Sequence, residues 1–101
     1  MVMRQTVVRY TTKDDAAAKE NQRLIEAVFA DISDRGGLDG LRSYDVSILE
    51  DGRSFVHVAV VEVDANPLLT LDSFQAFAST VSERAVEAPV SVTGDVFAHH
   101  P

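Results

Sequence analysis

The sequence predicts an α+β fold of the ferredoxin-like type, in which a four-stranded antiparallel sheet carries two helices on one face. Two segments repeat apolar residues at helical spacing, and four have the alternation or apolar density of strands. An Asp51-Gly52 pair, which is typical of a two-residue hairpin turn, lies between the middle two strands. The resulting order is βαββαβ, and the 101 residues are expected to form a single domain, 1–101.

The first strand is expected over Val2–Tyr10, because apolar residues occur on both of its alternating faces. A helix is expected from the polar break at Thr11–Asp15 to about Arg35, with Thr12 as its cap. Its apolar stripe recurs every three or four positions and consists of Leu24, Ile25, Val28, Phe29 and Ile32. Gly36-Gly37 is expected to end the helix, because glycine readily adopts the left-handed conformation found there.

The hairpin strands are expected over Leu41–Glu50 and Arg53–Val63. The turn sets a register in which Glu50 faces Arg53, Ile48 faces Phe55, Val46 faces His57, Tyr44 faces Ala59 and Arg42 faces Val61. One face of the hairpin then presents Tyr44 and His57 toward the helices. The other face contains Val56, Val58 and Val60.

The second helix is expected to begin at a Thr70 cap and to end before Pro89. One side of it is lined by Leu71, Phe74, Phe77, Ala78, Val81 and Ala85. The last strand is expected from Val90 to about His99, with Gly94-Asp95 as a bulge or bend. Both helices cover the same face of the sheet, so the Val56, Val58 and Val60 face needs another cover. We expect a second copy of the chain there, in a symmetric homodimer.

Composition excludes several classes of function. Nine Lys and Arg against sixteen Asp and Glu give a net charge of −7, which disfavours a nucleic-acid partner. The absence of cysteine excludes disulfides and thiolate chemistry. No apolar run has the length of a membrane helix, so no membrane partner is expected. We expect a cytoplasmic location. His99-His100 is an unpromising metal site, because adjacent strand residues point to opposite faces, so no metal is expected.

Five short segments also carry a family resemblance: Val7-Val8-Arg9-Tyr10, the helix segment Glu20 to Phe29, Phe55-Val56-His57-Val58, Asn66-Pro67-Leu68 and Phe74-Gln75-Ala76-Phe77. In this pattern the chain resembles the dimeric α/β-barrel superfamily, in particular the small antibiotic-biosynthesis-monooxygenase-like proteins. The resemblance implies a dimeric α/β barrel with a cavity between helices and sheet. Because the chain lacks tryptophan and its asparagines are Asn21 and Asn66, the haem-degrading signature of that superfamily does not carry over. No cofactor is expected.

His57 and Tyr44 are the candidate catalytic residues. In an apolar cavity built from both helices, a neutral His57 would take a phenolic proton while Tyr44 orients the substrate oxygen. The alternative is a core histidine whose hydrogen bonds are satisfied by Tyr44, a backbone carbonyl or water.

The candidate substrate-binding residues are Tyr10, Arg42, Phe29, Phe55, Phe74 and Phe77. Tyr10 and Arg42 are expected at one end of the cavity with Tyr44, where Arg42 either holds an anionic group or pairs with a carboxylate at the surface. The four phenylalanines form either an aromatic wall for a flat substrate or ordinary core.

Three functions stay open at this point. The first is a cofactor-free, monooxygenase-like enzyme acting on a small aromatic or quinone-like compound. The second is a non-catalytic ligand-binding module with the same cavity. The third is a structural dimer whose cavity is filled by side chains. A cavity of several hundred Å³ around His57 would separate the first two from the third.

Overall fold

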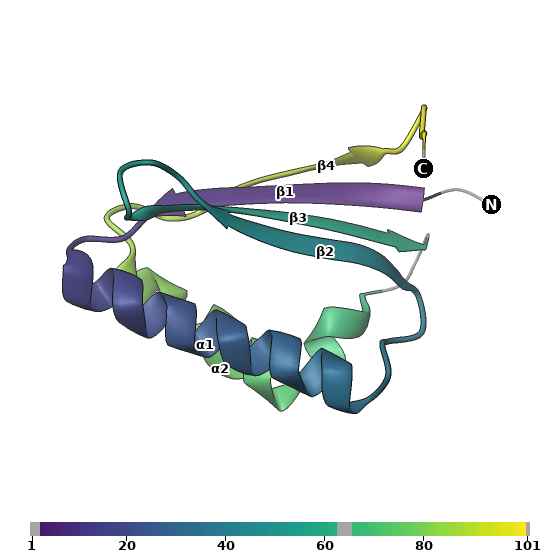
Figure 1. Cartoon of the computed structure of the whole chain (residues 1–101). Coiled ribbons are helices and arrows are strands. Elements are labelled where there is room, and N and C mark those ends of the chain that lie inside the picture. Colours follow the sequence, from purple (N-terminus) through teal and green to yellow (C-terminus); the bar gives the residue numbers. More distant parts are fainter. Residues whose placement is uncertain (1–2, 63–65, 101) are drawn as a thin grey trace.

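The computed structural model describes residues 3–62 and 66–100. Its elements are β1 (Met3–Thr11), α1 (Asp15–Asp34), β2 (Leu41–Ile48), β3 (Ser54–Glu62), the short 3₁₀ helix η1 (Pro67–Thr70), α2 (Asp72–Arg84) and β4 (Val90–Asp95). The strands form one antiparallel sheet in the order β2-β3-β1-β4, with α1 and α2 beneath it (Figure 1). The predicted ferredoxin-like α+β fold is confirmed.

The hairpin register is as predicted over most of its length. Ile48 faces Phe55, Val46 faces His57 and Tyr44 faces Ala59. The prediction is wrong at Arg42, because the register shifts between Leu41 and Ser43 and Leu41 becomes the partner of Val61. This irregularity has a physical reason. It lets Leu41 pack against the core, while the Arg42 guanidinium reaches the Glu62 carboxylate at 2.8 Å.

The cap of helix α1 lies two residues after the predicted one. Asp14 is the cap, and its Oδ1 accepts a hydrogen bond from the Ala17 amide at 2.7 Å. The expected cap, Thr12, is buried and donates its hydroxyl hydrogen to the Arg53 carbonyl at 2.9 Å instead. The end of the helix is as expected, since α1 stops at Asp34 and the positive-φ glycines of Gly36-Gly37 follow.

Helix α2 and strand β4 differ from the prediction at their ends. Thr70 does not cap α2, because it closes the η1 turn by donating its hydroxyl hydrogen to the Pro67 carbonyl at 2.6 Å. The predicted bulge at Gly94-Asp95 is absent, since Gly94 faces Gln5 and Asp95 faces Arg4 in regular register. Strand β4 also ends at Asp95, short of His99. Val63, in the predicted third strand, and Val2, in the first, lie outside the described residues.

The core fills the space between the sheet and the helices. Its buried members are Tyr10, Ala18, Ile25, Val28, Phe55, Leu68, Leu71 and Phe77. Alternation along the central strands explains the selection, because Tyr10 and Phe55 are register partners whose side chains point to the same face. The same alternation places His57 on this inner face, beside Val8.

The outer face of the sheet has no described segment over it (Figure 1). Its middle is an apolar row. Val92, Val7 and Val58 lie side by side across β4, β1 and β3. Val92 is 63% exposed, an unusual exposure for a valine in the middle of a strand row. This face is the one for which the sequence predicts a second copy.

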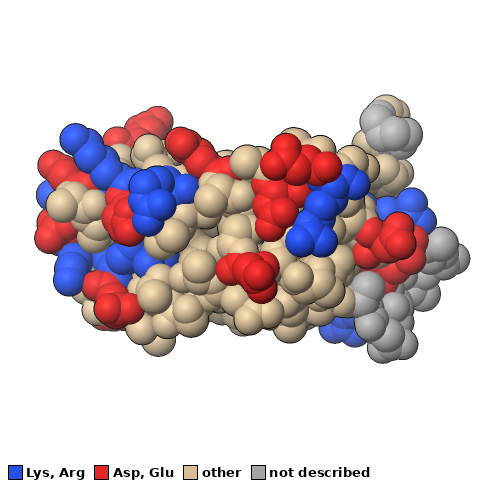
Figure 2. Space-filling view, turned by 90° about the horizontal axis from the view of Figure 1, so that it is seen from below, with Lys and Arg blue, Asp and Glu red and all other residues tan. Residues whose placement is uncertain are grey.

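The helical face looks different. Figure 2 views the molecule from below, where acidic and basic side chains lie among one another toward both ends and acidic side chains also lie on the more uncharged middle. Among residues 3–62 and 66–100, no helix is both long enough and apolar enough to cross a membrane.

Candidate functional site

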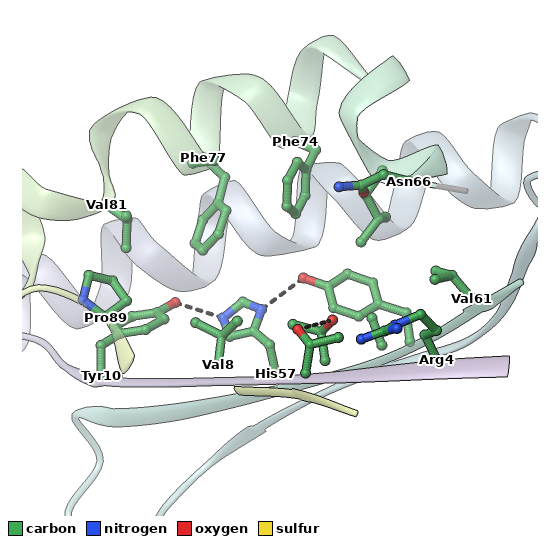
Figure 3. Close-up of a pocket in the computed structure, with 16 residues that line it drawn as sticks. Arg4, Val8, Tyr10, His57, Val61, Asn66, Phe74, Phe77, Val81 and Pro89 are labelled. Atoms are coloured by element: carbon green, nitrogen blue, oxygen red, sulfur yellow. Dashed lines mark hydrogen bonds between the residues drawn. The ribbon is translucent and has the colours of Figure 1, made fainter. Parts of the chain in front are cut away.

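A cavity of about 570 Å³ lies between the sheet and α2. Phe74, Phe77 and Val81 point down into it from α2, and Tyr10 and His57 rise from the strands below (Figure 3). Most of the remaining lining is apolar as well, and the described part of α1 supplies none of it. The expectation that both helices build the pocket is therefore wrong. The apolar stripe of α1 instead faces β2 and β3, where Phe29 stacks on the Tyr44 ring and, together with Ile25, borders a separate hollow beside Val46.

His57 lies at the centre of the floor and is 5% exposed. Its Nε2 is 2.8 Å from the Tyr10 hydroxyl, and its Nδ1 is 2.8 Å from the Tyr44 hydroxyl (Figure 3). Burial lowers the pKa of His57 to about 4, because the imidazolium form loses its hydration in this position. The side chain is therefore neutral at physiological pH, and both of its nitrogens are occupied by tyrosines.

The hydrogen bonds continue from Tyr10 into both helices. The Asn21 amide nitrogen on α1 donates to the Tyr10 hydroxyl oxygen at 2.8 Å. The Arg84 Nε on α2 donates to the Asn21 amide oxygen at 2.9 Å. Arg84 also donates to the Thr80 hydroxyl at 2.6 Å and to the Phe77 carbonyl at 3.0 Å. Arg84, Asn21, Tyr10, His57 and Tyr44 thus form one continuous chain, which we call the polar chain.

The interior members of the polar chain are closed to solvent. Asn21 is 0% exposed, Arg84 6% and Tyr10 7%. Within the described part of the protein, no carboxylate lies within 4.0 Å of the Arg84 guanidinium. Its hydrogen bonds and the Phe77 ring, whose centroid is 5.5 Å from the guanidinium carbon, replace an ion pair.

The hydroxyl groups of Tyr10 and Tyr44 stay protonated at neutral pH. Burial raises the pKa of Tyr10 to about 12, although the Asn21 hydrogen bond and the Arg84 charge act in the opposite direction. Burial also raises the pKa of Tyr44 well above its usual range, and the neighbouring Tyr10 adds to the rise. Both phenols are therefore hydrogen-bond donors at neutral pH.

The structure brings together five of the eight predicted site residues in this cavity: Tyr10, Tyr44, His57, Phe74 and Phe77. Phe29 stacks on the Tyr44 ring with centroids 5.0 Å apart. Together with Phe55 it lines a second, smaller hollow of about 330 Å³ on the α1 side. Arg42 lines neither space, and its ion pair with Glu62 matches the surface alternative.

Sequence reasoning assigned no site role to Asn21 or Arg84. A signal for both was present in their spacing. Asn21 lies three residues after Ala18 and four before Ile25, on the buried stripe of α1. Arg84 lies seven residues after Phe77, on the buried side of α2. A polar residue on a buried helical stripe needs a partner, so these positions predict a hydrogen-bonded interior.

One end of the cavity is more polar than the rest. Arg4, Asn66 and Thr93 line it, and the Arg4 guanidinium is 3.4 Å from the Asp95 carboxylate.

In the part of the chain that the structure describes, no three His, Asp or Glu side chains gather closely enough to hold a metal ion.

Comparison with known proteins identifies the fold. No protein-family model matches the chain. No curated protein matches its sequence. Solved structures do match over nearly the whole chain. The Rv0793 protein of Mycobacterium tuberculosis is 16% identical, with a TM-score of 0.75 over 98% of this chain and 99% of the other.

Two further structures bear descriptive names. A putative antibiotic biosynthesis monooxygenase from Caulobacter crescentus is 18% identical, with a TM-score of 0.71 over 96% of this chain and 92% of the other. SnoaB, a cofactor-independent oxygenase from Streptomyces nogalater, is 20% identical, with a TM-score of 0.60 over 100% and 97%. The chain therefore has the fold of the antibiotic-biosynthesis-monooxygenase-like proteins, as the resemblance in its sequence predicts.

Proposed function

We propose that this protein binds a small aromatic or quinone-like compound in the cavity beneath α2, and that it acts on this compound as a cofactor-free oxygenase. The observation that carries the proposal is a polar group, the Tyr44–His57 pair, in an otherwise largely apolar cavity of about 570 Å³. Cavities of this kind are typical of small-molecule sites. Solved structures with the same fold support the chemistry, since one of them is named a cofactor-independent oxygenase. We also propose that the protein acts in the cytoplasm.

The shape of the cavity suits a flat ligand. Phe74 and Phe77 form one wall, their ring centroids 5.9 Å apart, and the apolar side chains of β1 and β3 form the floor. A planar ligand between these layers would place an edge oxygen against the Tyr44 hydroxyl. The third function, a structural dimer with a filled interior, loses its basis because the cavity is open to a ligand.

In the oxygenase version, an activated CH₂ group of the ligand loses a proton to water and gives an anion. The anion transfers its electrons to O₂, and one oxygen atom enters the product as a carbonyl. The other oxygen atom leaves as water, which carries the proton lost first and the second hydrogen of the oxidised carbon. The protein's contribution is electrostatic, because a fixed hydroxyl donor stabilises the negative oxygen of the anion. Tyr44 makes this contact, and His57 acts on the ligand through Tyr44, since both of its nitrogens are already engaged.

Oxygen uptake tests the proposal directly. Wild-type protein and the Tyr44→Phe and His57→Ala variants would be compared in an oxygen electrode with a panel of quinols and anthrones. We expect uptake above the uncatalysed rate with at least one compound, and its loss in both variants. Binding by wild type without oxygen uptake would favour the non-catalytic ligand-binding module. No binding by any member of the panel would overturn both versions.

We also propose that a second copy of the chain covers the outer sheet face, through Val56, Val58 and Val60. Charge on this face supports a self-complementary contact. Arg9 and Asp45 lie on it with opposite charges, and neither has an ion-pair partner among the described residues. In a two-fold arrangement each can face its counterpart in the other copy.

A further inference from the structure

The direction of the hydrogen bonds in the polar chain begins at Arg84. A guanidinium has donors and no acceptor. Its Nε is 2.9 Å from the Asn21 amide oxygen, so this oxygen must face Arg84 and the amide nitrogen must face Tyr10. In the flipped orientation the Asn21 amide N–H would face the Arg84 Nε–H, and no water could separate them because Asn21 is 0% exposed. Arg84 therefore fixes the orientation of the Asn21 amide.

The second step concerns Tyr10. Its hydroxyl oxygen accepts a hydrogen bond from the Asn21 amide nitrogen at 2.8 Å. The hydroxyl hydrogen needs an acceptor of its own, and the remaining partner in the described structure is the His57 Nε2 at 2.8 Å. A buried hydroxyl without an acceptor is strongly disfavoured. Tyr10 therefore donates to Nε2, which carries no hydrogen.

The third step follows from the chemistry of imidazole. A neutral ring without hydrogen on Nε2 has it on Nδ1. His57 therefore donates from Nδ1 to the Tyr44 hydroxyl oxygen at 2.8 Å. Tyr44 lines the cavity, and its own hydroxyl hydrogen has no acceptor among the described residues. That hydrogen is available to whatever occupies the cavity.

We infer that Arg84 and Asn21 are positioning residues that orient the polar chain from α2 to β2, so that Tyr44 presents a hydrogen-bond donor and the cavity selects ligands with an acceptor oxygen, such as a carbonyl or phenolate. The inference rests on the proposed function, because it assumes that the ligand occupies this cavity. It adds the polarity of the group that the ligand must present and the two buried residues that decide this polarity.

The tautomer of His57 tests the direction of the chain without any ligand. Nitrogen-15 and carbon-13 NMR at pH 8 distinguishes the two neutral tautomers, and the exposed His99 and His100 serve as internal references. We expect His57 to carry its hydrogen on Nδ1. A hydrogen on Nε2 would overturn the inference.

The Asn21→Asp variant reverses the chain while preserving the shape of the side chain. A carboxylate accepts from Arg84 and also from the Tyr10 hydroxyl, so the Tyr10 oxygen would accept from His57 Nε2–H, and Tyr44 would donate to Nδ1. We expect the His57 tautomer to switch in this variant. Asn21→Asp with an unchanged Nδ1 hydrogen would show that Asn21 does not set the direction. If the variant fails to fold, the wild-type tautomer still decides the matter.

Three tricyclic probes of matched size test the ligand preference: 9-fluorenone, which has an acceptor, carbazole, which has a donor, and fluorene, which has neither. Isothermal titration with wild type should show about fivefold tighter binding of fluorenone than of fluorene, the effect of one neutral hydrogen bond. Asn21→Asp should prefer carbazole instead. Equal binding of all three to wild type would overturn the preference and leave the proposed cavity ligand standing. If no probe binds, both the ligand preference and the idea that a tricyclic compound occupies the cavity are overturned. The His57 tautomer then tests only the direction of the polar chain.

Discussion

Tyr44 and His57 are joined by a 2.8 Å hydrogen bond, although they are not opposite one another in the sheet. Val46 faces His57 and Ala59 faces Tyr44, so the two polar side chains are diagonal neighbours on adjacent strands. Phe29 of α1 stacks on the Tyr44 ring and holds it over the sheet. The diagonal contact therefore places the Tyr44 phenol and the His57 imidazole side by side in the lining of the cavity.

Stability should depend on pH through His57. Its pKa is lowered from 6.5 to about 4 by burial, so between these values the unfolded chain binds a proton that the folded protein does not. The stabilisation that comes from keeping His57 neutral is full above pH 6.5 and is lost as the pH falls toward 4, by about 3 kcal/mol in total. Urea denaturation from pH 7 to pH 4 measures it, with His57→Gln as the reference that cancels the carboxylates. Parallel pH profiles for the two proteins would contradict this.

Tyr10→Phe should destabilise the protein. The variant removes the acceptor of the buried Asn21 amide and the donor to His57 Nε2, and we expect a loss of about 1–3 kcal/mol in the free energy of unfolding. Tyr44→Phe is the matched control, since its hydroxyl borders the cavity and water can replace it. Urea denaturation of both variants is the measurement. A loss in Tyr10→Phe no larger than in Tyr44→Phe would show that Tyr10 is not the structural member of the pair.

Tyr44→Phe should instead affect ligand binding. We expect about fivefold weaker binding of 9-fluorenone, because one neutral hydrogen bond to the ketone oxygen is lost. Fluorene has the same shape and no acceptor, so its binding to this variant should equal its binding to wild type. Titration calorimetry with both compounds separates the hydrogen bond from the packing. Equal losses for the two compounds would assign the effect to a changed cavity shape.

Val58→Asp should convert the proposed dimer to a monomer. Val58 lies in the middle of the apolar row with Val7 and Val92, so the new carboxylate would be buried without a partner in a sheet-to-sheet contact. Sedimentation velocity at micromolar concentration measures the mass. Ala76→Asp adds the same charge at an exposed position of α2 and should remain dimeric. A wild type that sediments as a monomer would refute the proposed assembly.

The hairpin register could be predicted from sequence because the period of a strand is two and a strong turn signal fixed the pairing. This was enough to place Tyr44 and His57 on one face, on adjacent strands. The irregularity at Arg42 could not be predicted in the same way. It depends on whether Leu41 gains more by packing against the core than the regular ladder gains by continuing.

The cap of α1 and the polar chain were missed for a related reason. Thr12 and Asp14 both have the chemistry of a cap, and the choice is made by the Arg53 carbonyl, which lies 41 residues away in sequence and takes the Thr12 hydroxyl. Asn21 and Arg84 are 63 residues apart, and each stands among apolar neighbours on its own helix. Their contact exists only once both helices lie on the sheet.

The course of the polar chain has a consequence for how the helices are seated. It passes from α2 to α1, then to β1, β3 and β2, and so touches each of these elements once. Apolar burial does not by itself fix the position of a helix along a sheet, because the hydrophobic effect has no direction. Asn21 does fix this position, since a shift of α1 by one residue would separate its side chain from both Arg84 and Tyr10. The hydrogen bonds of these five residues thus form together only at one position of the helices on the sheet. A misplaced helix would leave buried donors without acceptors.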